Sequence, residues 1–150
     1  MTDIDASEVV PAPREAVFGF LSDLGNHWSV AGRWIEVVAL DGEGDGGRVR
    51  IRGPLGVRRT AVTSVERVDP PERLEGTALL GRTEARVAWT LREQPGGGTE
   101  VRLAATVVRA GPLDRAVLVL GGASWLRRLF AATLSRLATR FAGDARSARA

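Results

Sequence analysis

The sequence predicts one α+β domain in which a curved antiparallel sheet is covered by a long C-terminal helix. Three observations lead to this prediction. Apolar and polar residues alternate with a period of two in several stretches between residues 48 and 107, glycine- or proline-containing turns separate these stretches, and an apolar stripe with helical spacing begins at Leu126. Clean alternation indicates a sheet with one wet face and one covered face. The helix with the apolar stripe is the predicted cover.

The first part of the chain predicts a strand and then helical structure. Residues 3–10 are the first predicted strand. Pro13 suits the first turn of a helix, where its missing N–H costs no hydrogen bond, and apolar residues then recur at helical spacing as far as Leu24. A brief second helix or turn is expected around residues 27–31. One or two short helices therefore separate the first two strands.

Six further strands are predicted, over residues 33–40, 48–52, 57–68, 74–80, 84–92 and 100–107. The phase of the 57–68 strand is left open, because its apolar residues do not settle on one face. Short turns between successive strands indicate an antiparallel meander.

The C-terminal part predicts the covering helix. Gly111-Pro112 is a helix-start signal. Gly121-Gly122 is expected to kink this segment or to break it into a short and a long helix, since each glycine costs roughly 1 kcal/mol in mid-helix. By composition, residues 117–120 are also compatible with a strand. Residues 143–150 are expected to fray.

Composition limits what the protein can do. A chain of 150 residues fits one domain over residues 1–150, with its core over about residues 3–142. There is no cysteine, which excludes disulfides and thiolate chemistry, and a single histidine makes a transition-metal site improbable. We therefore expect no metal and no cofactor.

Charge and hydropathy argue against two classes of partner. All 21 basic residues are arginine, the net charge is only +3, and the arginines are interleaved with acids, so we expect no nucleic-acid partner. The N-terminus lacks the basic-then-apolar order of a signal peptide, and no apolar stretch reaches the roughly 20 residues of a membrane span. A cytoplasmic location is expected.

Several short motifs resemble those of a known family. They are the A-P-x-x-V-F-like run at residues 11–18, the helix end at residues 21–24, Trp28, the V-x-x-V-D-P-P-like run at residues 65–71, and residues 89–91 and 99–101 on either side of a glycine turn. Their order and spacing, over residues 3 to about 142, resemble the START-like SRPBCC superfamily, which includes polyketide cyclase/dehydrase and lipid-transport proteins. The resemblance implies a helix-grip fold, with a sheet of about seven strands wrapped around the C-terminal helix.

The expected function is binding or carriage of a hydrophobic small molecule, such as a lipid, a polyketide or a terpenoid-like compound. Ligand sites are mostly apolar with a few placed polar groups. The predicted apolar lining is Val49, Ile51, Leu74, Leu80, Val87, Trp89, Leu91, Leu103, Val107, Trp125, Leu129 and Thr133. The candidate polar groups are His27, Arg59, Thr63, Glu75 and Arg109.

Two alternatives stay open at this point. One is an enzyme of the polyketide cyclase/dehydrase type, with an acyl carrier protein as a possible partner, although no motif identifies a catalytic residue. The other is a structural or interaction domain whose interior is filled by its own side chains. The sequence gives neither the ligand nor the oligomeric state.

Overall fold

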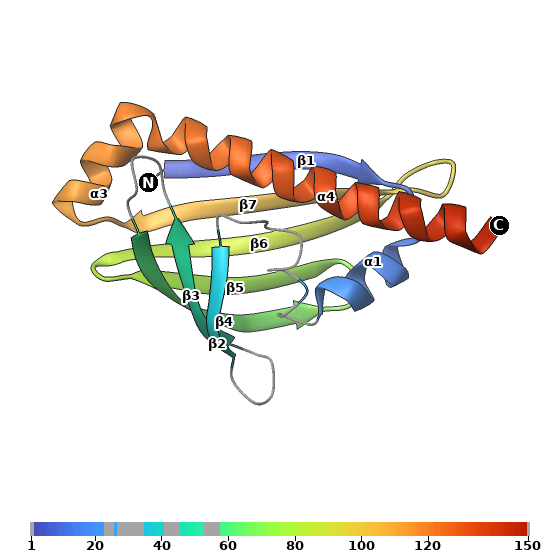
Figure 1. Ribbon diagram of the computed structural model, residues 1–150, viewed down its shortest axis with the longest axis horizontal. Helices are drawn as coiled ribbons and strands as arrows, with labels where there is room; N and C mark the ends of the chain where they lie inside the picture. Colours follow the sequence, from blue (N-terminus) through green and yellow to red (C-terminus); the bar gives the residue numbers. More distant parts are fainter. Residues whose placement is uncertain (1, 23–25, 27–34, 41–45, 53–57, 150) are drawn as a thin grey trace.

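The computed structural model describes residues 2–22, 26, 35–40, 46–52 and 58–149 (Figure 1). The elements are β1 (Thr2–Val10), α1 (Arg14–Leu21), β2 (Ile35–Leu40), β3 (Gly46–Arg52), β4 (Arg58–Asp69), β5 (Arg73–Leu80), β6 (Thr83–Glu93), β7 (Thr99–Arg109), α3 (Pro112–Val117), the π-helical turn η3 (Leu118–Gly122) and α4 (Ala123–Arg149). The second helix or turn expected around residues 27–31 lies outside the described residues.

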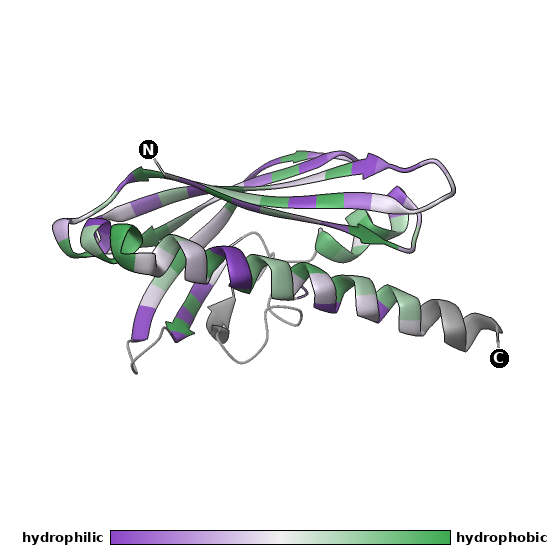
Figure 2. Ribbon diagram, turned by 90° about the horizontal axis from the view of Figure 1, so that it is seen from above, coloured by the Kyte–Doolittle hydropathy of each residue, from purple (hydrophilic) through white to green (hydrophobic). Residues whose placement is uncertain are grey.

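The described strands form one antiparallel sheet in the order β1-β7-β6-β5-β4-β3-β2. From β2 to β7 each strand pairs with its successor, as expected for a meander, and β1 pairs with β7. The sheet curves around the side on which α4 lies, and α4 crosses that side along β1 (Figures 1 and 2). The predicted α+β class and helix-grip arrangement are confirmed.

The hydrophobic core lies where α4, α1 and the sheet meet. Leu134 and Leu137 of α4 are fully buried, as are Val10 and Val17. They form one cluster with residues of α1, β5, β6 and β7, namely Phe18, Leu21, Leu74, Trp89, Leu91, Val101 and Leu103. Burying a large aliphatic side chain contributes about 1.5–3 kcal/mol. This cluster therefore holds the helix on the sheet.

The helical segment bends at the glycine pair, as the sequence predicts. Leu120 has φ of −87° and ψ of 16°, and Gly121 has φ of +118°, so both leave helical geometry. A φ in that range is readily adopted only by glycine. Residues 117–119 are helical and Leu120 belongs to the bend, so the strand alternative for residues 117–120 is wrong. The bend separates α3 from the long α4.

One helical run bears on the expectation that the chain has no membrane span. Among the described residues, the helical run Pro112–Gly143 is long and apolar enough to cross a membrane by length and composition. A core helix meets the same criteria of length and composition. The α4 part of this run buries Leu129, Leu134 and Leu137 in the domain.

A close approach of two strands explains the glycine at position 76 on β5. The pairing of β4 with β5 shifts register between Val65 and Arg67, and a Cβ atom placed on Gly76 would lie 2.3 Å from the backbone oxygen of Ser64. Real Cβ atoms do not come so close to backbone atoms, so only glycine fits without movement of β4.

Replacing Gly76 with Ala should therefore lower the free energy of unfolding by about 1–3 kcal/mol, the usual cost of overpacking. Chemical denaturation measures it. The matched control is Gly19→Ala in α1, where nothing lies within 4 Å of an added Cβ. That change should leave stability unchanged or raise it by up to about 1 kcal/mol. Equal stabilities of the two variants would contradict the account of the strand approach.

Candidate ligand-binding face

The inner face of the sheet carries its largest side chains near α1. Trp89 on β6 lies opposite Leu74 on β5 and Leu103 on β7. All three are at most 6% exposed and belong to the packed cluster that includes Leu134 and Leu137 of α4. This end of the face is filled by the protein itself.

The side chains become smaller along the same face. Two residues before Trp89, Val87 lies opposite Gly76 and Ala105, and two residues before that, Ala85 lies opposite Ala78. We call Gly76, Ala78, Ala85, Val87 and Ala105 the small-residue region. Every second residue of a strand faces the same side of the sheet, so all five positions face the side on which Trp89 lies.

The elements around the small-residue region contribute further apolar side chains. Val49 on β3 pairs with Ala61 on β4, and each is 1% exposed. On α4, Leu129 and Thr133 are buried and precede the residues that join the packed cluster. The Thr133 hydroxyl donates a hydrogen bond to the Leu129 carbonyl oxygen over 2.9 Å. The buried side of α4 therefore stays apolar ahead of the packed cluster, and the helix lies mainly beside β1.

A partly buried polar cluster lies at the start of β6, where α3 meets the sheet. Both terminal guanidinium nitrogens of Arg59 on β4 donate to the carboxylate of Asp114 on α3, with Nη2 to Oδ2 at 3.1 Å. Arg59 Nη2 also donates to the Leu80 carbonyl oxygen over 3.1 Å. The Thr83 hydroxyl donates to Asp114 and accepts a hydrogen bond from the Gly111 N–H over 3.2 Å. These contacts tie α3 to β4 and to the β5–β6 turn.

The charges within this cluster compensate each other. Hydrogen bonding from Arg59 holds the pKa of Asp114 below its usual range, against the opposing effect of burial. The same hydrogen bond raises the pKa of Arg59. Asp114 therefore stays ionised and Arg59 stays paired. The paired Arg59 holds α3 in position. Because Asp114 already compensates its charge, Arg59 would contribute little to binding an anionic ligand.

The structure narrows the predicted apolar lining. Leu74, Trp89, Leu91 and Leu103 belong to the packed cluster near α1. Of the remaining predicted residues, Val49, Val107, Leu129 and Thr133 are buried, and Ile51, Leu80, Val87 and Trp125 are half-buried. Val87 packs against the edge of the cluster. The candidate lining is therefore this second set together with the small-residue region.

The predicted polar groups do not come together among the described residues. Thr63 is half-buried and its hydroxyl donates to the Gly47 carbonyl oxygen over 3.3 Å. Glu75 lies between the inward residues Leu74 and Gly76, so it faces the opposite side of the sheet, where it pairs with Arg73. His27 lies outside the described residues.

Arg109, another predicted polar group, lies at the surface. Its side chain is 64% exposed and forms an ion pair with Glu84 over 3.4 Å. Arg109 and Glu75 are therefore removed from the candidate inner-face groups. Sequence reasoning missed Thr83 and Asp114, because their partner Arg59 lies far away in the chain and no local pattern joins them.

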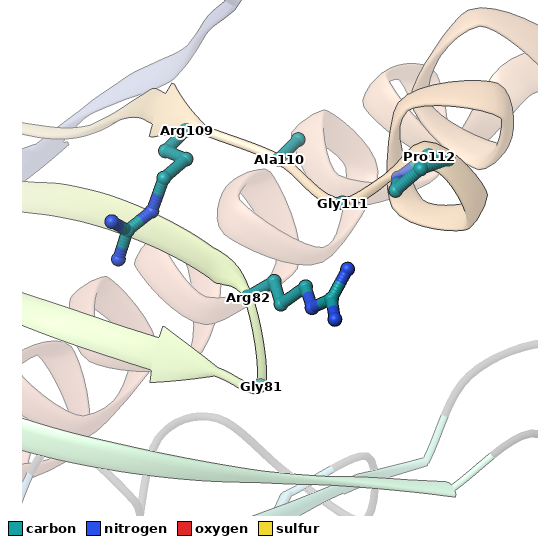
Figure 3. A pocket seen from close by; sticks show the side chains of 6 residues that line it. All are labelled: Gly81, Arg82, Arg109, Ala110, Gly111 and Pro112. Atoms are coloured by element: carbon teal, nitrogen blue, oxygen red, sulfur yellow. The ribbon is translucent and has the colours of Figure 1, made fainter.

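Two surface depressions lie where β7 leads into α3. One has a volume of about 480 Å³ and is lined by Gly81, Arg82, Arg109, Ala110, Gly111 and Pro112 (Figure 3). The other, of about 330 Å³, lies between the end of β7 and the α3–η3 segment and includes Arg115, Leu118 and Val119. Of the predicted polar groups in the described part of the chain, only Arg109 lines either depression.

Replacing Asp114 with Asn should destabilise the fold by about 1–2 kcal/mol at neutral pH, because it weakens the bonds to Arg59 and Thr83. Since the folded pKa of Asp114 is lowered, its contribution is complete above the unfolded value of about 4 and is lost as pH falls through the folded value. Melting temperatures measured from neutral pH down to acid should show the difference shrinking below about pH 4.

The matched control is Asp5→Asn, which removes an exposed ion pair with Arg102 at 3.0 Å. Exposed pairs contribute little, so this variant should melt close to the unchanged protein. If Asp114→Asn lowers the melting temperature at neutral pH no more than Asp5→Asn does, the cluster does not hold α3.

Comparison with known proteins agrees with this architecture. The chain matches the family described as polyketide cyclase / dehydrase and lipid transport over residues 1–142. No curated protein sequence matches it.

Solved structures with the same fold share little sequence with this chain. The protein TTHA0849 of Thermus thermophilus is similar at a TM-score of 0.73 and 21% identity, covering 95% of this chain and 99% of that one. Ms6760 of Mycobacterium smegmatis is similar at 0.70 and 16%, covering 95% and 92%. DynU16, a putative protein in the dynemicin biosynthetic locus, is similar at 0.58 and 20%, covering 91% of this chain and 46% of that one. At these identities the structures support the fold alone. The family match spans nearly the whole described sheet and helix, and the chain therefore belongs to the polyketide cyclase/dehydrase and lipid transport family.

Proposed function

We propose that this protein binds a hydrophobic small molecule between the small-residue region of the sheet and α4. The observation behind the proposal is the change in side-chain size along one face. Large residues fill the end near Trp89, whereas glycine, alanine and valine line the part that includes Ala85. On α4, Leu129 and Thr133 are buried as well, ahead of Leu134 and Leu137, which pack against the large residues. Small side chains on a face that is otherwise lined by large ones favour room for a ligand.

The chemistry of this face favours an apolar ligand without a net charge. Apolar surface removed from water contributes about 25 cal/mol per Å². The inward polar groups of the described strands are mainly hydroxyls, such as Thr63, which suit orientation of a ligand oxygen. Arg59 is already paired with Asp114, so it is a poor partner for a ligand carboxylate. An acyl chain, a polyketide or a terpenoid-like compound fits these properties.

The described residues favour binding over catalysis. A cyclase or dehydratase reaction needs an acid–base group within hydrogen-bonding reach of the ligand. Of the predicted groups that the structure describes, Glu75 faces outward, Arg109 lies at the surface and Arg59 is paired. An acyl carrier protein as partner belongs to the enzymatic alternative and is not part of this proposal.

Replacing Ala85 with Phe tests the proposed space directly. If the small-residue region holds a ligand, the ring enters that space, the free energy of unfolding changes by less than about 1 kcal/mol, and binding of the fluorescent probe anilinonaphthalene sulfonate is lost. Denaturation and a probe titration measure the two quantities.

The matched control is Ala88→Phe, on the opposite face of the same strand, which should leave probe binding unchanged. If the interior is filled, Ala85→Phe instead costs about 1–3 kcal/mol through overpacking, and the unchanged protein binds no probe. That pair of results would contradict the proposal and favour a domain with a filled core.

A further inference from the structure

The end of the molecule formed by α3 and η3 exposes an unusual amount of apolar surface. Leu113 is 74% exposed, Val117 51%, Val119 81% and Leu120 86%; we call these four residues the apolar tip. No residue of α3 or η3 is buried. The most apolar 18-residue window of the run Pro112–Gly143 is only 11% buried. Large exposed apolar patches mark surfaces that bind a partner or a membrane.

Specific contacts hold the apolar tip in this exposed position. The start of α3 is tied to the sheet through Asp114, which accepts hydrogen bonds from Arg59 and Thr83. The end of η3 turns at Gly121, with its φ of +118°. A Cβ on the next residue, Gly122, would lie 2.7 Å from the Val117 backbone oxygen, so the bend is tight as well as sharp. In Figure 1, α3 projects past the sheet at the end opposite the C-terminus.

Arginines surround the apolar tip. The depression of about 480 Å³ borders Pro112 at the start of α3, and it is lined by Arg82 from the β5–β6 turn and Arg109 from the end of β7 (Figure 3). Arg115, one turn into the same helix, is exposed and lines the neighbouring depression together with Val119. Arg109 is paired with Glu84, whereas no carboxylate within the described part of the chain forms an ion pair with Arg82. The rim of the apolar tip is therefore basic.

We propose that the apolar tip and its arginine rim dock this protein on a membrane surface that contains anionic phospholipid. Valine and leucine side chains enter the boundary between headgroups and acyl chains, as in amphipathic interfacial helices. The guanidinium groups of Arg82 and Arg115 bind lipid phosphates, with the depression beside Pro112 as the place for a headgroup.

The positive charge of the rim distinguishes two possible partners of the apolar tip, a membrane surface and a second copy of the chain. In a symmetric dimer each residue of the patch meets the same patch on the partner, so the basic rims would face each other. Like charges brought together across an interface are unfavourable. An anionic lipid surface offers acyl chains to the apolar tip and phosphate groups to the arginine rim. This inference does not depend on a ligand between the sheet and α4.

Sedimentation with lipid vesicles tests the proposal on the full chain. Vesicles of equal parts phosphatidylcholine and phosphatidylglycerol should bind the protein, vesicles of phosphatidylcholine alone should bind much less, and added salt should weaken the binding. The double variant V119S/L120S should lower partitioning onto the anionic vesicles by about tenfold or more.

The chain offers a matched control with the same residue types. Val62 and Leu79 pair across β4 and β5 and are 49% and 40% exposed on the outer face of the sheet, not on α3 or η3. The variant V62S/L79S should bind the anionic vesicles as the unchanged protein does. For the rim, Arg82→Gln should lower binding roughly fivefold, whereas Arg86→Gln, an exposed arginine within β6, should change it little. Melting temperatures confirm that each variant folds.

Three results would overturn the proposal. They are equal binding to neutral and anionic vesicles, vesicle binding that V119S/L120S leaves unchanged, and no vesicle binding by a protein whose self-association in sedimentation velocity is abolished by V119S/L120S. The last result would make the apolar tip a subunit interface. Probe binding between the sheet and α4 is measured without vesicles and in the V119S/L120S background, which removes probe bound at the apolar tip, so failure of either proposal is seen separately.

Discussion

The packing of α4 against the sheet through Leu134 and Leu137 is the interaction on which the rest of the structure depends. These residues meet Trp89 and Leu103, and α1 closes the same cluster from its own side. Without that contact the inner face of the sheet would be open to water. With it, the helix is held over a face whose side chains become small beyond Trp89. The proposed ligand space depends on this packing, because the packing holds the helix against one end of that face.

A second constraint acts on α3, ahead of the start of α4. Asp114 is the only acid in α3, and its carboxylate joins three segments through Arg59, Thr83 and the helix itself. The bend at Gly121 then returns the chain to α4. Because these two features place α3 and η3 beyond the sheet, their valines and leucines have no core to enter. The apolar tip is thus a consequence of how the segment is tied down.

Much of the fold could be predicted from the sequence because its signals are local. Alternation placed Val87, Trp89 and Leu91 on one face of a strand, and the structure places them there. The glycine pair at residues 121–122 predicted the bend, since glycine alone accepts the backbone geometry it needs.

The candidate site was less predictable, because it depends on distances between elements. Trp89 was equally compatible with a ligand wall and with the core, and only the position of α1 and α4 makes it core. Arg59 and Asp114 are 55 residues apart, so no spacing rule joins them. Gly76 is required by a register shift on the neighbouring strand, which the phase of β4 did not reveal.

The central claim is that the inner face holds a hydrophobic molecule, and native mass spectrometry of the protein purified from its own host tests it most directly. The account predicts a bound lipophilic compound of one defined mass, which is released on unfolding and can then be identified. A spectrum of protein alone, together with no response to anilinonaphthalene sulfonate, would contradict the claim and would mean that side chains fill the interior.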